Sequence, residues 1–217
     1  MKYLTLLFLL SFSQGGGSQT VTVPVHNPSF EIHAPFTYGD QCGVKGGWAG
    51  VPVSGWQFSN GASAFQPTQP NPCGIRAFPL PDGSTVALAG AYTGTSTISQ
   101  DTGVKASDFF TMYGDGVYTM TFYVANYFNV YPGFYQAKLL IEEHELCATE
   151  GWGTPNWTQI TLVCPAPSYS IVDQWVPPDP TPEPSELNYH LIISFAAVGP
   201  HAWPVLFDDI SLTFTPK

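Results

Sequence analysis

Two carboxylates near opposite ends of the chain are the side chains whose setting most needs a chemical explanation. Asp208 alternates in phase with the apolar residues Leu206 and Ile210 in the last predicted strand, so we expect it on the apolar face. A buried charge must be paired, hydrogen-bonded or bound to a metal. Near the other end, Glu31 follows an apolar residue, and Asn27 would add a further oxygen ligand. Oxygen donors without sulfur or imidazole suit calcium. The sequence therefore leaves two alternatives: a calcium site made by Asn27, Glu31 and Asp208, or carboxylates that protein hydrogen bonds satisfy.

Aromatic residues form the second group with recognisable chemistry, since they make up 15% of the chain. The densest run lies at residues 127–135, between two predicted strands. Aromatic faces stack on sugar rings while a few polar groups orient the sugar hydroxyls, so rings in loops predict carbohydrate binding. The alternative is that these rings close the two ends of the hydrophobic core. The predicted ligand-binding residues are Trp48, Tyr127, Tyr131, Tyr135, Trp152 and Trp175.

Acidic residues at 142–145 are the best candidates for acid and base catalysis, yet they favour a non-catalytic interpretation. Glu143 and Glu145 would share one face of a predicted strand over residues 137–146, and Glu142 would share the other with His144. Neighbours on one strand lie at the short end of the separation that glycoside hydrolysis needs. A solvated edge strand explains the same residues without chemistry. The sequence also lacks a Gly-x-Ser-x-Gly nucleophile motif, so we expect no catalytic residues.

The charge of the chain restricts its partners. Its formal net charge is −10, with only six Lys plus Arg residues. These cations are too few to form the basic stripe that a phosphate backbone requires, so nucleic acid is not an expected partner. The same charge repels acidic polysaccharides and anionic lipids, which favours a neutral or cationic ligand.

Residues 1–18 have the pattern of a signal peptide. Met1 and Lys2 precede an apolar stretch of roughly ten residues, which is too short to span a bilayer. No later run of membrane length follows. We therefore expect a secreted, extracellular protein without membrane insertion, in which residues 19–217 form a single domain.

The expected export predicts that the four cysteines form disulfides, because such bonds persist in oxidising compartments. Of three connectivities, we favour Cys42 with Cys73 and Cys147 with Cys164, since each pair is local in sequence and brackets a turn-rich segment. No pair has the close spacing of zinc ligands, which makes a metal site the weaker alternative.

Alternation of apolar and polar residues predicts an all-β protein. It is clearest over residues 116–126, where Met120, Phe122 and Val124 share one face. Frequent Gly and Pro leave little room for a long helix, and the Pro-rich stretch at 165–186 is either an excursion between strands or a linker. About nine or ten antiparallel strands without a βαβ rhythm predict a β-sandwich. Further strands are predicted at residues 20–25, 29–33, 53–59, 84–89, 96–100, 137–146, 157–164 and 187–198, and in the last segment of the chain.

A series of short motifs along the chain resembles that of secreted galactose-binding-like jelly-roll domains, the fold of many carbohydrate-binding modules. In order, the motifs are Asn27-Pro28-Ser29-Phe30-Glu31, Gly55-Trp56, Asp82-Gly83, Ser99-Gln100, Tyr118-Thr119-Met120-Thr121-Phe122 and Phe207-Asp208-Asp209-Ile210-Ser211-Leu212. The resemblance implies a jelly-roll β-sandwich and a structural calcium that bridges Glu31 and Asp208. The Pro-rich insertion and the cysteines depart from the family pattern.

The resemblance also implies a function, which is non-catalytic binding of neutral carbohydrate or of a cell-surface glycan. One alternative is a structural or adhesive protein that contacts other extracellular proteins. Another is a small polysaccharide-degrading enzyme on the same fold.

Overall fold

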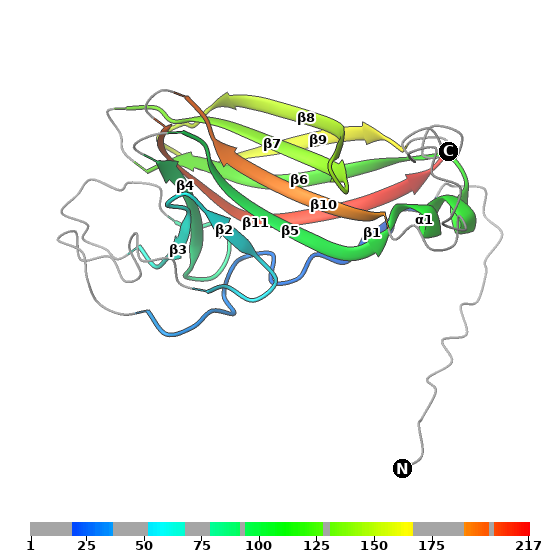
Figure 1. Ribbon diagram of the computed structural model, residues 1–217, viewed down its shortest axis with the longest axis horizontal. Helices are drawn as coiled ribbons and strands as arrows, with labels where there is room; N and C mark the ends of the chain where they lie inside the picture. Colours follow the sequence, from blue (N-terminus) through cyan, green and yellow to red (C-terminus); the bar gives the residue numbers. More distant parts are fainter. Residues whose placement is uncertain are drawn as a thin grey trace, which may run out of the picture.

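The computed structural model of the protein shows two antiparallel β-sheets packed face to face (Figure 1). It describes residues 19–36, 52–67, 79–91, 94–127, 131–166, 189–199 and 202–217. These ranges contain eleven strands and one short helix, where the sequence predicted nine or ten strands. The bounds are β1 Val21–Val23, β2 Gln57–Ser59, β3 Ser63–Phe65, β4 Val86–Ala91, β5 Ser96–Lys105, α1 Ala106–Tyr113, β6 Gly116–Asn126, β7 Phe134–Ile141, β8 His144–Trp152, β9 Thr158–Pro165, β10 His190–Ala197 and β11 Ala202–Pro216. The predicted all-β jelly-roll sandwich is confirmed.

Strands from distant parts of the chain alternate within each sheet. The six-stranded sheet runs β3-β4-β11-β6-β9, with β1 also paired to β11, and the five-stranded sheet runs β2-β5-β10-β7-β8. Figure 1 shows α1 at one end of the sandwich and, at the other end, the start of β7 and β11 beside the end of β8 and β10. In the described part of the chain, no helix has the length and apolar character needed to cross a membrane.

The core forms because alternate residues of each strand face the opposite sheet. In β6, Met120, Phe122 and Val124 are at most 1% exposed, as the alternation predicted. Large rings meet between the sheets: the ring centroid of Phe195 in β10 lies 5.0 Å from that of Phe122 and 4.8 Å from that of Phe207 in β11. The two sheets therefore share one hydrophobic core.

The sandwich is covalently closed along one side. Cys147 in β8 is bonded to Cys164 in β9, and these are the outermost strands of the two sheets on that side. This bond confirms one of the two predicted disulfides, whereas Cys42 and Cys73 lie outside the described residues. On the other side, a tight turn at Asn60-Gly61 takes the chain from β2 in one sheet to β3 in the other. Positive φ angles of 49° and 84° suit an Asn-Gly pair at this turn.

The predicted strand over residues 137–146 is wrong, because the chain reverses direction in its middle. β7 ends at Ile141 and β8 begins at His144, which makes residues 142 and 143 a two-residue hairpin turn. Glu142 has a φ of 53°, a conformation that a glutamate rarely adopts. Its backbone N–H donates to the carbonyl of His190 at 3.0 Å, and its carboxylate accepts the N–H of His190 at 2.8 Å. These contacts with β10 hold the turn where sequence alone predicted continued strand.

The predicted strand over residues 29–33 is also wrong. The Phe30 N–H donates to the Asn27 carbonyl at 3.1 Å, and both residues have positive φ, so this segment is a turn. Phe30 is fully buried, with its ring 4.9 Å from that of Trp56. The burial of this ring offsets the cost of its unusual backbone conformation.

Candidate functional site

Four aromatic side chains gather at the end of the sandwich opposite α1. They are Tyr131, Phe134, Trp152 and Trp203, and they come from the segment before β7, the start of β7, the end of β8 and the start of β11. Together with Pro132, Val198 and Gly199 they line a cavity of about 620 Å³. We call this cavity the aromatic pocket. Figure 1 shows the strand ends that carry these residues at the end of the sandwich away from α1, where β7 and β11 begin and β8 ends.

Two ring pairs form the walls of the aromatic pocket. Tyr131 stacks on Trp203 with ring centroids 4.4 Å apart and planes 10° from parallel. Phe134 meets Trp152 edge-on, with centroids 5.0 Å apart. Tyr131, Trp152 and Trp203 are 51%, 62% and 37% exposed. Exposed aromatic rings gathered around a hollow are typical of a binding surface, because water is displaced from them at little cost.

A buried amide, Asn126 at the end of β6, positions both walls. Its Oδ1 accepts the Gly133 N–H at 3.0 Å, and its backbone N–H donates to the Thr154 carbonyl at 2.7 Å. Gly153 then donates its N–H to the Gly133 carbonyl at 2.8 Å. Both glycines are required by close approach: a Cβ on Gly133 would lie 2.4 Å from the Trp203 carbonyl oxygen, and one on Gly153 would lie 2.2 Å from Asn126 Oδ1. Asn126 thus ties the segment before β7 to the segment after Trp152.

We expect Asn126→Ala to loosen the aromatic pocket. The change leaves the Gly133 N–H buried without its acceptor, which costs about 1–3 kcal/mol of unfolding free energy. Urea denaturation measures this loss, and faster hydrogen exchange at Gly133 reports it locally. The matched control is Asn156→Ala, which removes an exposed amide from the neighbouring turn. Equal stabilities for the two variants would contradict this role of Asn126.

The predicted ligand-binding aromatics divide into three groups. Tyr131 and Trp152 line the aromatic pocket. Tyr127 and Tyr135 do not, because each is only 4% exposed. Tyr135 packs edge-on against rings of the main core, and Tyr127 belongs to a small apolar cluster beside β4 and β11. Both tyrosines are therefore buried in the fold, Tyr135 in the main core and Tyr127 in the smaller cluster. Trp48 and Trp175 lie outside the described residues.

Sequence reasoning missed two of the four aromatic residues of the pocket, Phe134 and Trp203. Phe134 belongs to the aromatic run at 127–135. Neighbouring residues of a strand face opposite sides, so Phe134 faces outward because Tyr135 beside it is buried. Trp203 stands in β11 far along the chain, and nothing in its local sequence shows that it stacks on Tyr131. Only the strand order brings the two rings together.

The carboxylate of Glu31 is held by the segment before β4. Its Oε1 accepts the N–H groups of Ser84 and Thr85 at 2.8 and 2.6 Å, and its Oε2 accepts their hydroxyls at 3.1 and 3.3 Å. Asn27 is engaged separately: its Oδ1 accepts the Ile32 N–H at 3.0 Å, and its Nδ2 donates to the carbonyls of Ile32 and Ser54. Both side chains are therefore used to fix loops.

Asp208 is buried, but on the opposite side of its sheet from the side that the alternation predicted. A bulge between Asp208 and Ser211, with Asp209 at a φ of 48°, shifts the alternation of β11. Phe207 faces the core before the bulge and Ile210 faces it afterwards, which leaves Asp208 on the outer side of its sheet. There its Oδ2 accepts the Asp82 N–H at 3.2 Å and its Oδ1 accepts the Asp209 N–H at 2.8 Å.

Burial raises the pKa of Asp208 to about 8. The two N–H groups oppose this shift, and the charges of Asp209 and Asp82 add to it. The Asp208 side chain is fully shielded from solvent, so its charged form lacks hydration. At neutral pH this carboxyl group is consequently protonated in a large fraction of molecules.

The three predicted calcium ligands each have protein hydrogen-bond partners in the structure. Among the described residues, no three side chains of His, Cys, Asp or Glu are grouped closely enough to hold a metal ion. The contacts of Glu31 and Asp208 are those that the hydrogen-bonded alternative predicts. Calcium binding by Asn27, Glu31 and Asp208 stays a prediction, and the pH dependence of stability separates the two alternatives.

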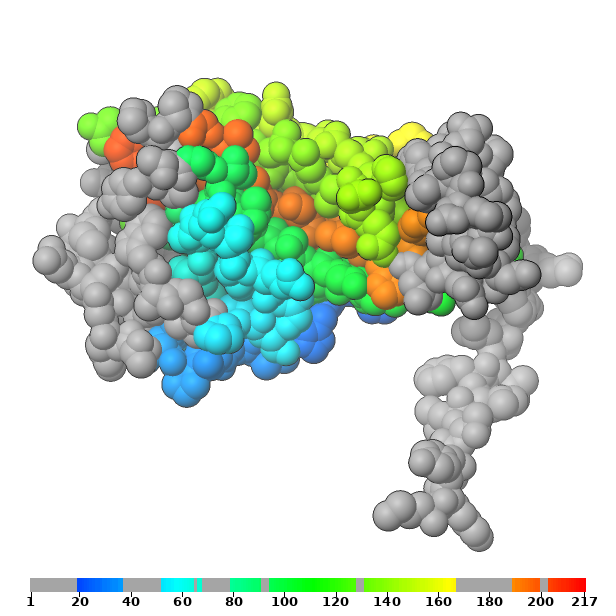
Figure 2. Space-filling view, in the orientation of Figure 1, coloured from blue at the N-terminus to red at the C-terminus, as the bar shows by residue number. Residues whose placement is uncertain are grey.

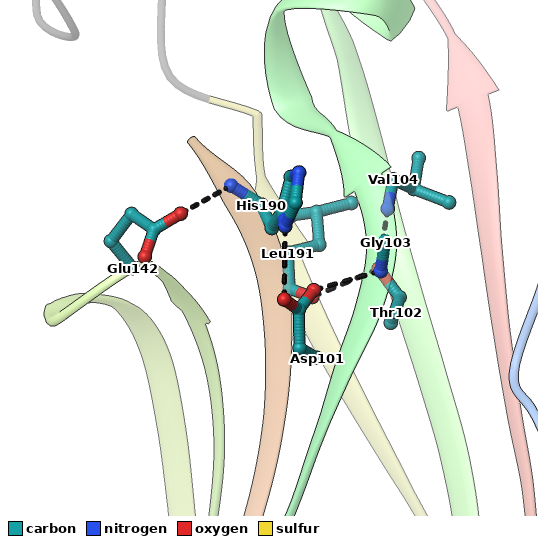
Figure 3. Close-up of polar contacts among 7 residues, drawn as sticks. All are labelled: Asp101, Thr102, Gly103, Val104, Glu142, His190 and Leu191. Carbon is teal, nitrogen blue, oxygen red and sulfur yellow. Dashed lines mark hydrogen bonds and ion pairs between the residues drawn. The ribbon is translucent and has the colours of Figure 1, made fainter. Parts of the chain in front are cut away.

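A second polar cluster joins β5, β10 and the β7–β8 turn near the α1 end of the five-stranded sheet (Figure 3). His190 donates from Nδ1 to Asp101 Oδ2 at 2.9 Å, while its backbone binds Glu142 in the β7–β8 turn. Burial acts to raise the pKa of Asp101, but hydrogen bonds from His190 and Gly103 lower it below its usual value. Glu145 is likewise engaged, by Lys138 at 2.8 Å. These carboxylates stabilise strand ends and are not arranged around a cavity.

The outer face of the five-stranded sheet adjoins the aromatic pocket, because β7 and β8 continue beyond the Phe134–Trp152 pair. Register places Phe134 opposite Trp152, then Gln136 opposite Glu150, and then Lys138 opposite Ala148. Figure 2 looks onto this face, with β10 in orange between β5 and β7. A ligand that leaves the aromatic pocket along the strands would therefore meet polar side chains next.

Comparison with solved structures identifies the same fold in two kinds of protein. A cyclase from Fischerella sp. TAU gives a TM-score of 0.60 at 17% identity, covering 91% of this chain and 98% of that chain. The Stig cyclase Fisc from the same organism, solved with (3Z)-3-(1-methyl-2-pyrrolidinylidene)-3H-indole, gives 0.56 at 17% identity, with 91% and 99% covered. The CBM22-1-CBM22-2 tandem domain of Paenibacillus barcinonensis Xyn10C gives 0.50 at 11% identity, with 94% and 48% covered.

No protein-family model and no curated protein matches the chain. At the identities found, the structural similarities establish the fold alone. They confirm the predicted resemblance at the level of the jelly-roll fold, which the chain shares with a tandem of carbohydrate-binding modules.

Proposed function

We propose that the protein is a secreted, non-catalytic module that binds carbohydrate, and that the aromatic pocket is its binding site. The observation that carries this proposal is the pair of exposed tryptophans, Trp152 and Trp203, with Tyr131 stacked parallel on Trp203. The apolar face of a pyranose ring packs on such a surface and releases the water that covers it. The cavity of about 620 Å³ lies within the range of small-molecule sites.

Side-chain chemistry around the aromatic pocket supports binding rather than catalysis. Glycoside hydrolysis needs two carboxylates that flank the bond to be broken. None of the described residues that line the cavity is acidic or basic. The engaged carboxylates Asp101, Glu142 and Glu145 serve the sheet itself. The Cys147–Cys164 disulfide supports an extracellular location, because such bonds persist in oxidising compartments.

A second candidate ligand is a planar hydrophobic small molecule. It is favoured by one observation, which is that nearly all atoms exposed in the aromatic pocket are apolar. The similar Stig cyclase was solved with an indole compound. Carbohydrate remains the leading ligand because polar side chains of the adjoining sheet face continue the site beyond the cavity.

An array of neutral polysaccharides and oligosaccharides, probed with and without a calcium chelator, tests the proposal. We expect retention on at least one glycan. We further expect Trp203→Ala to weaken binding about tenfold or more, because it removes one platform and the support of Tyr131. Met112→Ala is the control, since it removes an exposed apolar side chain from α1 at the other end.

Other outcomes identify the alternatives. Binding of indole compounds without any glycan would favour the small-molecule ligand. Self-association or capture of an extracellular protein without glycan binding would indicate an adhesive protein, and release of reducing ends would indicate an enzyme. Any of these three results would contradict the proposed function.

A further inference from the structure

Two polar side chains on neighbouring strands lie beside the aromatic pocket. Gln136 of β7 and Glu150 of β8 are register partners, one step along the ladder from the Phe134–Trp152 pair. Residues two apart on a strand share a face and lie about 7 Å apart, so Glu150 projects on the same side as Trp152. Both Glu150 and Trp152 are exposed. A sugar ring stacked on Trp152 would have its substituents within reach of Glu150.

The carboxylate of Glu150 differs from its neighbours on this sheet. Glu145 is paired with Lys138, and Glu142 accepts the N–H of His190. Across the described residues, neither Glu150 nor Gln136 makes a side-chain hydrogen bond or an ion pair. Because no described residue uses these groups, we infer that their hydrogen-bonding capacity is available to a ligand.

We propose that Glu150 makes the site selective for glycans that carry a protonated amino group. This inference rests on the proposed function and names the ligand class of the same site. A carboxylate accepts only, and its hydrogen bonds are strongest with charged donors such as an ammonium group. The Gln136 amide both donates and accepts, which suits the adjacent sugar hydroxyl.

Charge elsewhere in the molecule favours the same ligand. The cation on this part of the face, Lys138, is neutralised by Glu145 at 2.8 Å, so it does not compete for Glu150. The chain as a whole has a formal net charge of −10, which attracts a cationic polymer and repels polymers of uronic acids. An amino-sugar chain thus combines the apolar ring faces that Trp152 binds with the charge that Glu150 accepts.

A matched pair of ligands tests this selectivity. The β-1,4-linked glucosamine tetramer and its fully N-acetylated counterpart share one backbone and differ in charge. Titration calorimetry with the full chain, at low salt and about pH 6 where sugar amines are protonated, measures both affinities. We expect the glucosamine tetramer to bind roughly two- to fivefold more tightly, as one exposed charged contact provides.

Two variants separate a local contact from general attraction. Glu150→Gln is expected to remove the preference while retaining binding of the N-acetylated tetramer. Glu143→Gln makes the same change in charge at the turn that begins β8 and is expected to keep the preference. Equal effects of the two variants, equal affinities of the wild type for both tetramers, or failure of both tetramers to bind would overturn the role of Glu150. Binding of other glycans on the array would then still support the proposed function, whereas binding of no glycan at all would overturn both.

Discussion

The free energy of unfolding is expected to fall as pH rises from about 5 to about 8 in the presence of a chelator. The cause is Asp208, whose pKa burial raises to about 8 in the folded protein, against an ordinary value of 3.8. Between these values the folded state holds a proton that the unfolded state has released. A rise in pH favours the state with fewer bound protons, which here is the unfolded state. The free energy of unfolding therefore decreases by up to about 1.4 kcal/mol per pH unit. Above the folded pKa no further loss arises from this group.

Asp208→Asn assigns this pH dependence to one residue. The asparagine keeps the size of the side chain and cannot ionise, so its variant is expected to lose most of the slope. It is less stable than the wild type near pH 5, because its Nδ2 faces one of the two N–H donors, Asp82 or Asp209. Urea denaturation across the pH range measures both proteins. A wild-type stability that is flat or rises over this range in chelator would contradict a protonated, buried Asp208.

The same experiment with calcium decides between the two alternatives for the carboxylates. A bound cation requires the ionised form of Asp208. It therefore inverts the contribution of Asp208 to the pH dependence of the free energy of unfolding. If the predicted site at Asn27, Glu31 and Asp208 binds calcium, added calcium stabilises the protein increasingly as pH rises. If hydrogen bonds alone satisfy these groups, calcium leaves the melting temperature unchanged at every pH.

Removal of the Cys147–Cys164 bond by a double change to alanine is expected to lower the free energy of unfolding by about 3 kcal/mol. The bond closes a loop with a sequence separation of 17 and restricts the unfolded chain accordingly. It also joins the outermost strands of the two sheets, β8 and β9, so its loss frees both edges together.

Cooperative urea denaturation of the alanine variant and the wild type measures this effect. Val163→Ala is the control, because it changes an exposed side chain next to Cys164 without touching the bond. We expect the control to differ from the wild type by less than about 0.5 kcal/mol. A double variant as stable as the wild type would show that the two sheets do not depend on this closure.

The alternation of side chains predicted the fold well because one physical cause, burial between two sheets, repeats along every long strand. It identified the buried residues of β6. The confirmed disulfide was predicted separately, from the closeness of its two cysteines in the sequence. It failed where contacts with distant strands determine the backbone. The turn at Glu142 depends on His190, and the bulge after Asp208 reverses the alternation that had placed this residue on the core face.

The candidate site was predictable only in part. Loop aromatics include both binding and core residues, and local sequence does not separate the exposed Tyr131 from the buried Tyr127. Trp203 could not be found because its partner is more than seventy residues earlier in the chain. Asn126 was missed for a similar reason, since its role is to join two segments that meet only after the sheets have formed.

The most direct test of carbohydrate binding in the aromatic pocket follows the indole N–H signals of the tryptophans by NMR while a retained glycan is titrated. We expect the signals of Trp152 and Trp203 to shift with saturation. The signal of Trp56, which donates its Nε1–H to the Asn27 carbonyl at 2.9 Å inside the core, should stay in place. Saturable binding that leaves both exposed tryptophans unchanged would contradict the assignment of the aromatic pocket as the binding site.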